Sequence, residues 1–154
     1  MLFRSRLTWD RPLLHVAIAT PTGPLHVINL HLRAPRAAFI AGAKAGGHWR
    51  SSAEWAEGYY LAARKRHGQA LEARLFVETL FDAAPDALIA VCGDLNADAF
   101  ETPTRLIEAL PDDVESADFS ARRLEPLERR VAGERRYSVI HDGRPLLLDQ
   151  IGRA

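Results

Sequence analysis

The feature that most constrains this chain is a short uncharged run that ends abruptly in polar residues. Residues 87–92, Ala-Leu-Ile-Ala-Val-Cys, carry no charge and have the length of a buried strand. Gly93 follows, and then Asp94 and Asn96 stand with one residue between them. Alternate side chains of an extended chain share a face, so these two polar groups are predicted to point the same way at the end of a core strand.

This polar pair has two interpretations. Carboxylate and carboxamide oxygens are hard ligands that Mg²⁺ or Mn²⁺ accepts, which makes Asp94 and Asn96 candidate metal ligands. Gly, Asp and Asn after a strand also favour a plain Asx-type turn that holds no ligand. Because the motif is short, this stretch alone favours the turn over the metal site. The other polar positions of the chain shift the preference toward a functional site.

The composition excludes several broad classes of protein. A length of 154 residues fits one domain, and 47% hydrophobic with 26% charged residues is ordinary for a soluble globular protein. The formal net charge of zero argues against a simple non-specific DNA coat, but says little against an enzyme with local contacts. No apolar run approaches the ~20 residues of a membrane span and no signal peptide is visible, so a cytoplasmic location is expected.

The first half of the chain predicts a hairpin and a long helix. Residues 13–20 and 25–32 are β-like segments around a Pro-Thr-Gly-Pro turn. Apolar residues on both faces of the second segment predict burial on both sides. Residues 51–82 form an amphipathic helical pattern that starts with a capping box at Ser51 and Glu54, and its Trp and Tyr side chains are predicted to face the core.

The last part of the chain predicts a second hairpin around Asp142-Gly143. In the register that this turn sets, Ile140 faces Pro145 and Asp149 faces Arg136. Asp149 therefore has two interpretations: it is an ion pair with Arg136, or it is a functional carboxylate in an apolar strand.

The long loop of residues 33–50 carries a local basic cluster on a neutral protein. Loops of this length in compact domains tend to be functional or mobile. The loop is either simply solvated or faces an anion. In the second case it determines substrate choice, with Arg33, Arg36 and Arg50 as substrate ligands.

Three predicted apolar strands each carry polar residues at or near one end. Asn29 and His31 stand two residues apart, as Asp94 and Asn96 do, and Asp149 lies in the last apolar strand. Taken alone, His31 reads as a hydrogen-bonded core histidine. Three such strand ends in one small α/β chain favour a common site.

These segments resemble the endonuclease/exonuclease/phosphatase superfamily, which includes pancreatic deoxyribonuclease and bacterial sphingomyelinases. The matching pieces are residues 27–32, 93–97 and 148–151, in the family's order and with a long helix between the first two. The resemblance implies an α/β (α+β) fold that forms part of a four-layer α/β/β/α sandwich with largely antiparallel sheets.

The resemblance also implies roles for single residues. His31 matches the histidine that contacts the scissile phosphate, and Asp94 matches the carboxylate that orients or deprotonates the attacking water. Asn96 matches the amide that holds that water or a phosphate oxygen, and Asp149 matches the acid that orients a later histidine. The implied cofactor is Mg²⁺ or Mn²⁺ at Asp94 and Asn96, and Asn29 joins the substrate ligands. The implied partner is a phosphoester substrate: a nucleic acid, a phospholipid or a small phosphate ester.

The chain departs from the family at both ends. The family's early Asn and metal-binding Glu have no equivalent, the Ser-Asp-His motif is absent, and Gln150 stands where His is usual. Residues 152–154 do not look like the continuation of a strand. Residues 1–154 are therefore expected to be a partial domain that lacks N-terminal strands and the C-terminal Ser-Asp-His segment, and to be inactive or nearly so alone.

Three functions remain open at this point. The first is a metal-dependent phosphoesterase, the second a non-catalytic remnant that binds a partner through the same face, and the third an unrelated α/β binding domain. Strong divalent-metal binding at Asp94 would favour the first. A truncated sandwich would leave a sheet edge and apolar surface uncovered, so self-association is expected, although the sequence gives no oligomeric state.

Overall fold

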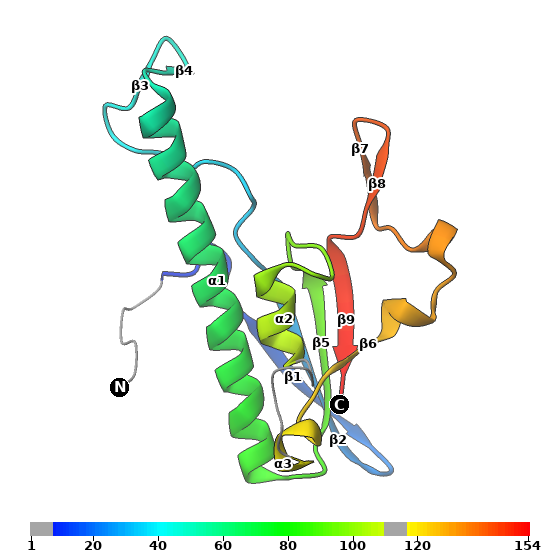
Figure 1. Ribbon diagram of the computed structural model, residues 1–154. Coiled ribbons are helices and arrows are strands. Elements are labelled where there is room, and N and C mark those ends of the chain that lie inside the picture. The colour runs from blue at the N-terminus through cyan, green and yellow to red at the C-terminus, as the bar shows by residue number, and fades with distance from the viewer. Residues whose placement is uncertain (1–7, 110–116) are drawn as a thin grey trace.

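The computed structural model describes residues 8–109 and 117–154, which fold around one five-stranded sheet (Figure 1). Three of its four strand pairs are antiparallel, and the β2–β5 pair is parallel. The prediction of an α/β chain with a largely antiparallel sheet is confirmed. In spatial order, the strands are β1 (Leu14–Thr20), β2 (Gly23–His31), β5 (Leu88–Asp94), β9 (Asp149–Arg153) and β6 (Glu125–Pro126).

Two helices cover one face of this sheet (Figure 1). The long helix α1 begins after Ser51, whose hydroxyl accepts the Glu54 N–H at 3.2 Å, as the capping box predicts. None of the helices among the described residues is long and apolar enough to cross a membrane. The helices are α1 (Ser52–Ala83), α2 (Thr102–Glu108) and α3 (Ala117–Ser120), with 3₁₀ turns η2 (Leu127–Arg130) and η3 (Gly133–Arg135).

The core lies between α1 and the sheet. Alternate residues of β2 and β5 point toward the helices, and a stripe of α1 packs on them. Burial of this apolar surface is what holds α1 against the strands. The buried side chains include Ile28, Leu30, Leu32, Ile89 and Val91 from the strands and their ends, and Ala70, Ala73, Val77 and Phe81 from α1.

The opposite face of the sheet remains open among the described residues. Leu14, Val16 and Ile18 of β1 are exposed there, and Ile151 of β9 is exposed as well. On β2 itself, Leu25 and Val27 of this face are half-buried and Asn29 is exposed, so the predicted burial of β2 on both sides is only partial among the described residues, because α1 and α2 both pack on the other face. The four-layer sandwich stays a prediction.

The aromatic side chains near the start of α1 do not face the core, contrary to the prediction. Trp55, Tyr59 and Tyr60 are all exposed. The reason is that the first turns of α1 extend past the end of the five-stranded sheet (Figure 1), so none of its strands lies beneath them. A small hairpin of β3 (Lys44–Ala45) and β4 (His48–Trp49) accompanies them, inside the segment that was expected to be a plain loop.

The C-terminal region confirms one expectation and overturns two. Strands β7 (Val139–His141) and β8 (Arg144–Leu146) pair in the predicted register, with Ile140 opposite Pro145. Arg136 donates to the backbone carbonyls of Arg129 and Val131, so its predicted ion pair with Asp149 is wrong. The expectation for the last residues is also wrong, since β9 continues to Arg153.

Glu108 at the end of α2 is a buried carboxylate. It is only 3% exposed, and the Arg129 guanidinium lies 3.3 Å from its Oε2. Burial raises the pKa of Glu108 to about 7, while Arg129 lowers it and the nearby Glu128 raises it. The folded chain therefore holds this proton more tightly than the unfolded chain does.

Replacing Glu108 by glutamine is expected to remove a pH dependence of stability. In the native chain this group contributes fully below its ordinary pKa of 4.5, and the contribution falls as pH rises toward about 7. The loss amounts to roughly 3 kcal/mol of unfolding free energy. Urea unfolding at pH 5 and pH 8 measures it. The exposed Glu134→Gln variant should keep the native pH dependence, and parallel curves for all three proteins would contradict the prediction.

Candidate functional site

Three side chains on neighbouring strands form a row across the open face of the sheet. His31 of β2 stands opposite Asp94 of β5, and Asp94 stands opposite Asp149 of β9. Directly opposed residues of adjacent strands point to the same face. The structure therefore brings together three of the four predicted catalytic residues, and they are called the His31–Asp94–Asp149 row below.

Asp94 is the centre of this row and is held from two sides. Its Oδ2 lies 3.4 Å from Nε2 of His31. Its Oδ1 accepts the backbone N–H of Asn96 at 2.9 Å. These contacts orient the carboxylate, and its side chain keeps 29% of its surface exposed to solvent, so a small ligand can reach it.

Asp149 is held by its backbone rather than by its carboxylate. The N–H groups of Leu148 and Asp149 both donate to the Ser138 hydroxyl at 3.0 Å. The exposed Asp149 side chain therefore stands beside Asp94 as a second negative charge on the same face. Two neighbouring carboxylates favour a cation between them.

Asn96 is placed differently from the prediction. Strand β5 ends at Asp94, and Asn96 adopts a left-handed conformation with a φ of 48°. Its Nδ2 donates to the carbonyl of Leu32 at 3.0 Å, which ties the end of β2 to the loop after β5. The prediction that Asp94 and Asn96 share one face of an extended strand is thus wrong. The chain instead forms the Asx-type turn that was the alternative interpretation. The predicted ligand role of Asn96 would have to use its remaining Oδ1.

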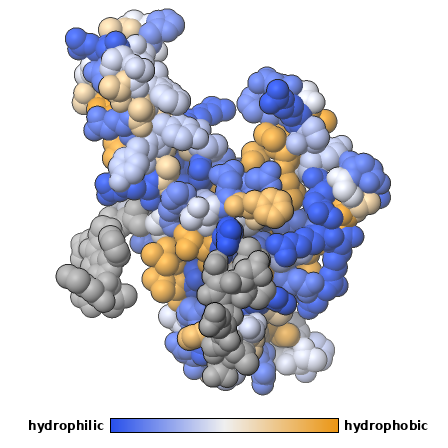
Figure 2. All heavy atoms as spheres, viewed as in Figure 1, coloured by the Kyte–Doolittle hydropathy of each residue, from blue (hydrophilic) through white to orange (hydrophobic). Residues whose placement is uncertain are grey.

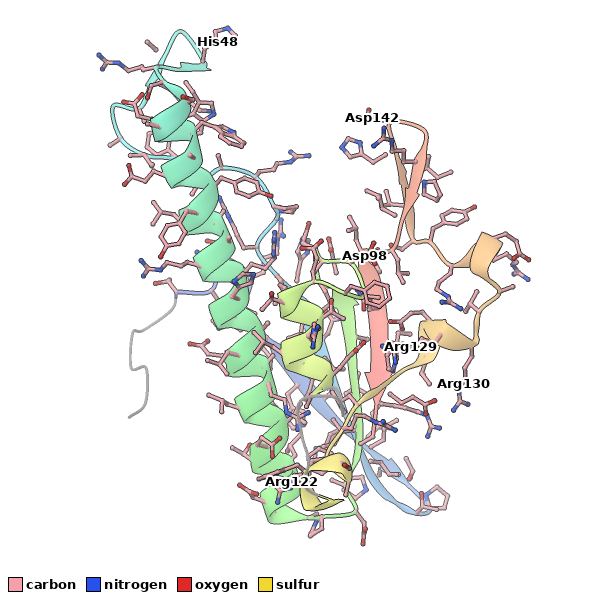
Figure 3. The ribbon with its side chains drawn as sticks, viewed as in Figure 1. His48, Asp98, Arg122, Arg129, Arg130 and Asp142 are labelled. Carbon is pink, nitrogen blue, oxygen red and sulfur yellow. The ribbon has the colours of Figure 1, made fainter. Side chains whose placement is uncertain are left out.

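A cavity of about 470 Å³ opens beside Asn96. Arg36 lines it, so the structure places one predicted substrate ligand close to this loop. Figure 3 shows Asp98 near this end of the sheet, with Asp142 at the tip of the β7–β8 hairpin above it. The other polar lining residues were missed by sequence reasoning, namely Asp98, Glu101 and His141.

The remaining predicted substrate ligands lie apart from one another. Asn29 is exposed on the same face as the row, and its Nδ2 lies 3.7 Å from the sulfur of Cys92. Arg33 lies 3.4 Å from Asp10. Asp10 also binds Lys65, which lowers the pKa of the Asp10 carboxyl. Arg50 donates to the Gly42 carbonyl near the tip of the loop, so it has a different partner from Arg33.

Two buried polar residues of α1 support the loops around the site. Gln69 accepts the backbone N–H of Arg33 at 2.8 Å, and Arg66 lies 3.5 Å from Glu101. Both side chains are almost fully buried. The signal that could have found them is their position, since they interrupt the apolar stripe of an amphipathic helix at i and i+3.

No family model and no curated protein matches the chain. Two solved structures are similar to it. The human Nocturnin catalytic domain with bound sulfate anion is 16% identical with a TM-score of 0.48, and sphingomyelinase C from Streptomyces griseocarneus is 17% identical with a TM-score of 0.45. Each match covers 92% of this chain and 41% of the other, so the chain spans less than half of either protein.

Both of these proteins have the endonuclease/exonuclease/phosphatase fold that the sequence motifs resemble. A similarity of this size says nothing about chemistry, which has to come from the residues of this chain. Among residues 8–109 and 117–154, no three His, Cys, Asp or Glu side chains converge to hold a metal ion.

The donors that are present fit an open metal site better than a closed cage. Mg²⁺ is usually held by one or two carboxylates and keeps waters or substrate phosphates as its other ligands. Asp94 and Asp149 provide two carboxylates on one accessible face. The row therefore combines an imidazole, an oriented carboxylate and a second acid in reach of solvent.

Proposed function

We propose that this chain carries part of a metal-dependent phosphoesterase centre, which hydrolyses phosphodiester or phosphomonoester bonds within the complete domain. The observation that carries the proposal is the His31–Asp94–Asp149 row, with His31 Nε2 at 3.4 Å from Asp94 Oδ2. Phosphoester hydrolysis needs a positioned water and stabilisation of charge on the phosphoryl oxygens. An oriented carboxylate beside an imidazole supplies both kinds of group.

Each residue of the row has a role in this chemistry. Asp94 orients the attacking water and accepts its proton as the water oxygen bonds to phosphorus. His31 donates a hydrogen bond to a phosphoryl oxygen, the ester P–O bond breaks, and the leaving oxygen takes up a proton from solvent water. A bound Mg²⁺ or Mn²⁺, held by Asp94 with Asp149 or the Asn96 Oδ1, would neutralise phosphoryl charge.

The domain proposal follows from length and topology. The chain spans 41% of each solved structure to which it is similar. The open sheet face carries the row, and we infer that a second sheet of the complete domain covers the apolar part of that face, as in a four-layer sandwich. The isolated chain is then expected to turn over little or no phosphoester.

A non-catalytic binding module is the second candidate. The observation in its favour is that no group of three His, Cys, Asp or Glu side chains converges on a metal position among the described residues. In that case the same face would bind a partner without turnover.

A Mn²⁺ titration followed by the electron paramagnetic resonance of the free ion tests the proposal. The chain is expected to bind Mn²⁺, and Asp94→Asn is expected to weaken this binding at least about tenfold, because it removes a charged ligand. Hydrolysis of bis(p-nitrophenyl) phosphate in the same Mn²⁺ buffer should stay at the level of the Asp94→Asn protein.

Asp86→Asn is the matched control, since Asp86 is an exposed carboxylate in the turn before β5. It should bind Mn²⁺ as the native chain does. Equal Mn²⁺ binding by the native and Asp94→Asn chains would overturn the metal centre and leave the binding module. Clear turnover that Asp94→Asn abolishes would show a complete enzyme and overturn the partial-domain proposal.

A further inference from the structure

The first turns of α1 and the preceding loop form an arm that projects beyond the sheet (Figure 1). The arm comprises residues 34–64 and includes the β3–β4 hairpin. Gly58 makes its packing possible, because a Cβ there would lie 2.7 Å from the carbonyl oxygen of Ala38 and 3.1 Å from the Trp49 ring. The space-filling view shows the tip of the arm standing clear of the rest of the molecule (Figure 2).

The arm carries more positive than negative charge. The arm has four basic side chains, Arg36, Lys44, Arg50 and Arg64, against two acids, Glu54 and Glu57. Among the described residues, none of the four forms an ion pair with a carboxylate. Several arginines outside the arm pair with carboxylates, namely Arg74, Arg122, Arg129 and Arg130. The arm thus keeps its positive charge available to a ligand.

Two of these cations lie against aromatic rings instead. The Lys44 ammonium is 4.6 Å from the centroid of the Trp49 ring, and the Arg64 guanidinium is 5.9 Å from that of Tyr60. Cation–π contacts of this kind hold a positive charge beside a flat apolar surface. A ligand of the arm would therefore meet a positive charge and an aromatic ring at the same place.

The arm also exposes flat rings at helical spacing. Trp55 and Tyr59, at i and i+4, stack with ring centroids 5.4 Å apart. Tyr60 and Arg64 form a second i, i+4 pair. Trp55 is 46% exposed, Tyr60 59% and Phe39 in the loop 79%. So many exposed rings on one projecting segment mark an interaction surface rather than ordinary scatter.

We propose that this arm binds single-stranded nucleic acid and presents it to the phosphoesterase centre. Sequence-tolerant binding of single strands combines a cationic track for phosphates with aromatic side chains on which bases stack. The arm supplies both, and it begins next to the row, since the chain passes from His31 through Arg36 at the cavity into the arm. The binding stands on the arm alone, and only the assignment of substrate class rests on the proposed function.

An anionic bilayer is a poorer match for the same residues. Glu57 is exposed and stands three residues before Tyr60, on the same face of α1, so an anionic bilayer that received the Tyr60 ring would also meet this negative charge. The bases of a single strand can stack on individual rings while its phosphates meet Lys44 and Arg50 on the loop and hairpin before the helix.

Fluorescence anisotropy of a fluorescein-labelled oligothymidylate, titrated with the chain in EDTA, tests the arm without any metal. The native chain is expected to bind, and Trp55→Ala/Tyr59→Ala is expected to weaken the binding at least about tenfold through lost stacking. Lys44→Gln/Arg50→Gln should make the slope of log K against log salt shallower by roughly 1.4, because two phosphate contacts are lost. Far-ultraviolet circular dichroism establishes that each variant keeps its helix.

The matched controls remove an exposed ring and an exposed cation outside the arm. Phe119→Ala and Arg130→Gln should bind the oligonucleotide as the native chain does. Absence of binding at low salt, equal losses in the controls, or binding to phosphatidylglycerol vesicles in place of the oligonucleotide would each overturn the proposal. EDTA removes the metal, so the two proposals are tested separately. If the oligonucleotide binds but Asp94→Asn does not change Mn²⁺ binding, only the proposed function is refuted. If Mn²⁺ binding depends on Asp94 but the oligonucleotide does not bind, only the proposal for the arm is refuted.

Discussion

Gly93→Ala is expected to destabilise the chain by about 3 kcal/mol or more. Gly93 has a φ of 123°, which an L side chain rarely adopts, and an added Cβ would lie 2.1 Å from the carbonyl oxygen of Leu30. Leu30 is its register partner in the neighbouring strand β2, so neither strand can move away without breaking the β2–β5 pairing. Urea unfolding followed by circular dichroism measures the loss.

The same substitution should disturb the site as well as the stability, because Gly93 precedes Asp94 at the end of β5. Gly133→Ala is the matched control. A Cβ at Gly133 meets no atom within 4 Å, so that variant should stay within about 0.5 kcal/mol of the native chain. Equal stabilities of the two variants would contradict the close approach of β2 and β5.

Arg74→Ala is expected to destabilise the chain by about 3 kcal/mol or more. The buried guanidinium joins three parts of the fold, because it donates to the carbonyls of Ile107 at 3.2 Å and Arg122 at 2.9 Å and pairs with Glu78. Removing it leaves buried carbonyls unsatisfied and opens a cavity between α1 and α2. Urea unfolding again provides the measurement.

A lysine at this position should recover only part of the loss, since one ammonium group cannot reach the same acceptors as a planar guanidinium. Arg130→Ala is the comparison, because Arg130 is exposed and pairs only with Glu125 among the described residues. Its expected effect is below about 1 kcal/mol. A comparable loss in both variants would mean that Arg74 acts as an ordinary surface charge.

Local chemistry was sufficient to predict much of the fold. The start of α1 follows from Ser51 and Glu54, whose hydrogen bonds span only three residues. The Asp142-Gly143 turn set the register of β7 and β8 down to the pairing of Ile140 with Pro145. These predictions were confirmed because each depends on neighbours in the sequence and on the geometry of a single turn.

The predictions that were wrong depended on what lies beyond the local segment. Trp55 and Tyr59 were expected in the core, yet no strand of the five-stranded sheet lies beneath the first turns of α1. Asn96 was expected to lie on the extended strand, but the strand ends at Asp94. Asn96 lies in the turn that follows, and its Nδ2 donates to the Leu32 carbonyl. Arg136 was expected at Asp149, but nearby backbone carbonyls bind it instead.

The sequence by itself determined the elements and the residue types of the candidate site, because hydrophobic period, capping and turn residues act over a few positions. Only the tertiary structure decided that His31, Asp94 and Asp149 form one row. That row requires β2, β5 and β9 to be adjacent in register, although Asp94 and Asp149 are far apart in the chain. Strand order and register depend on long-range pairing and on which faces α1 covers, and no local pattern encodes either.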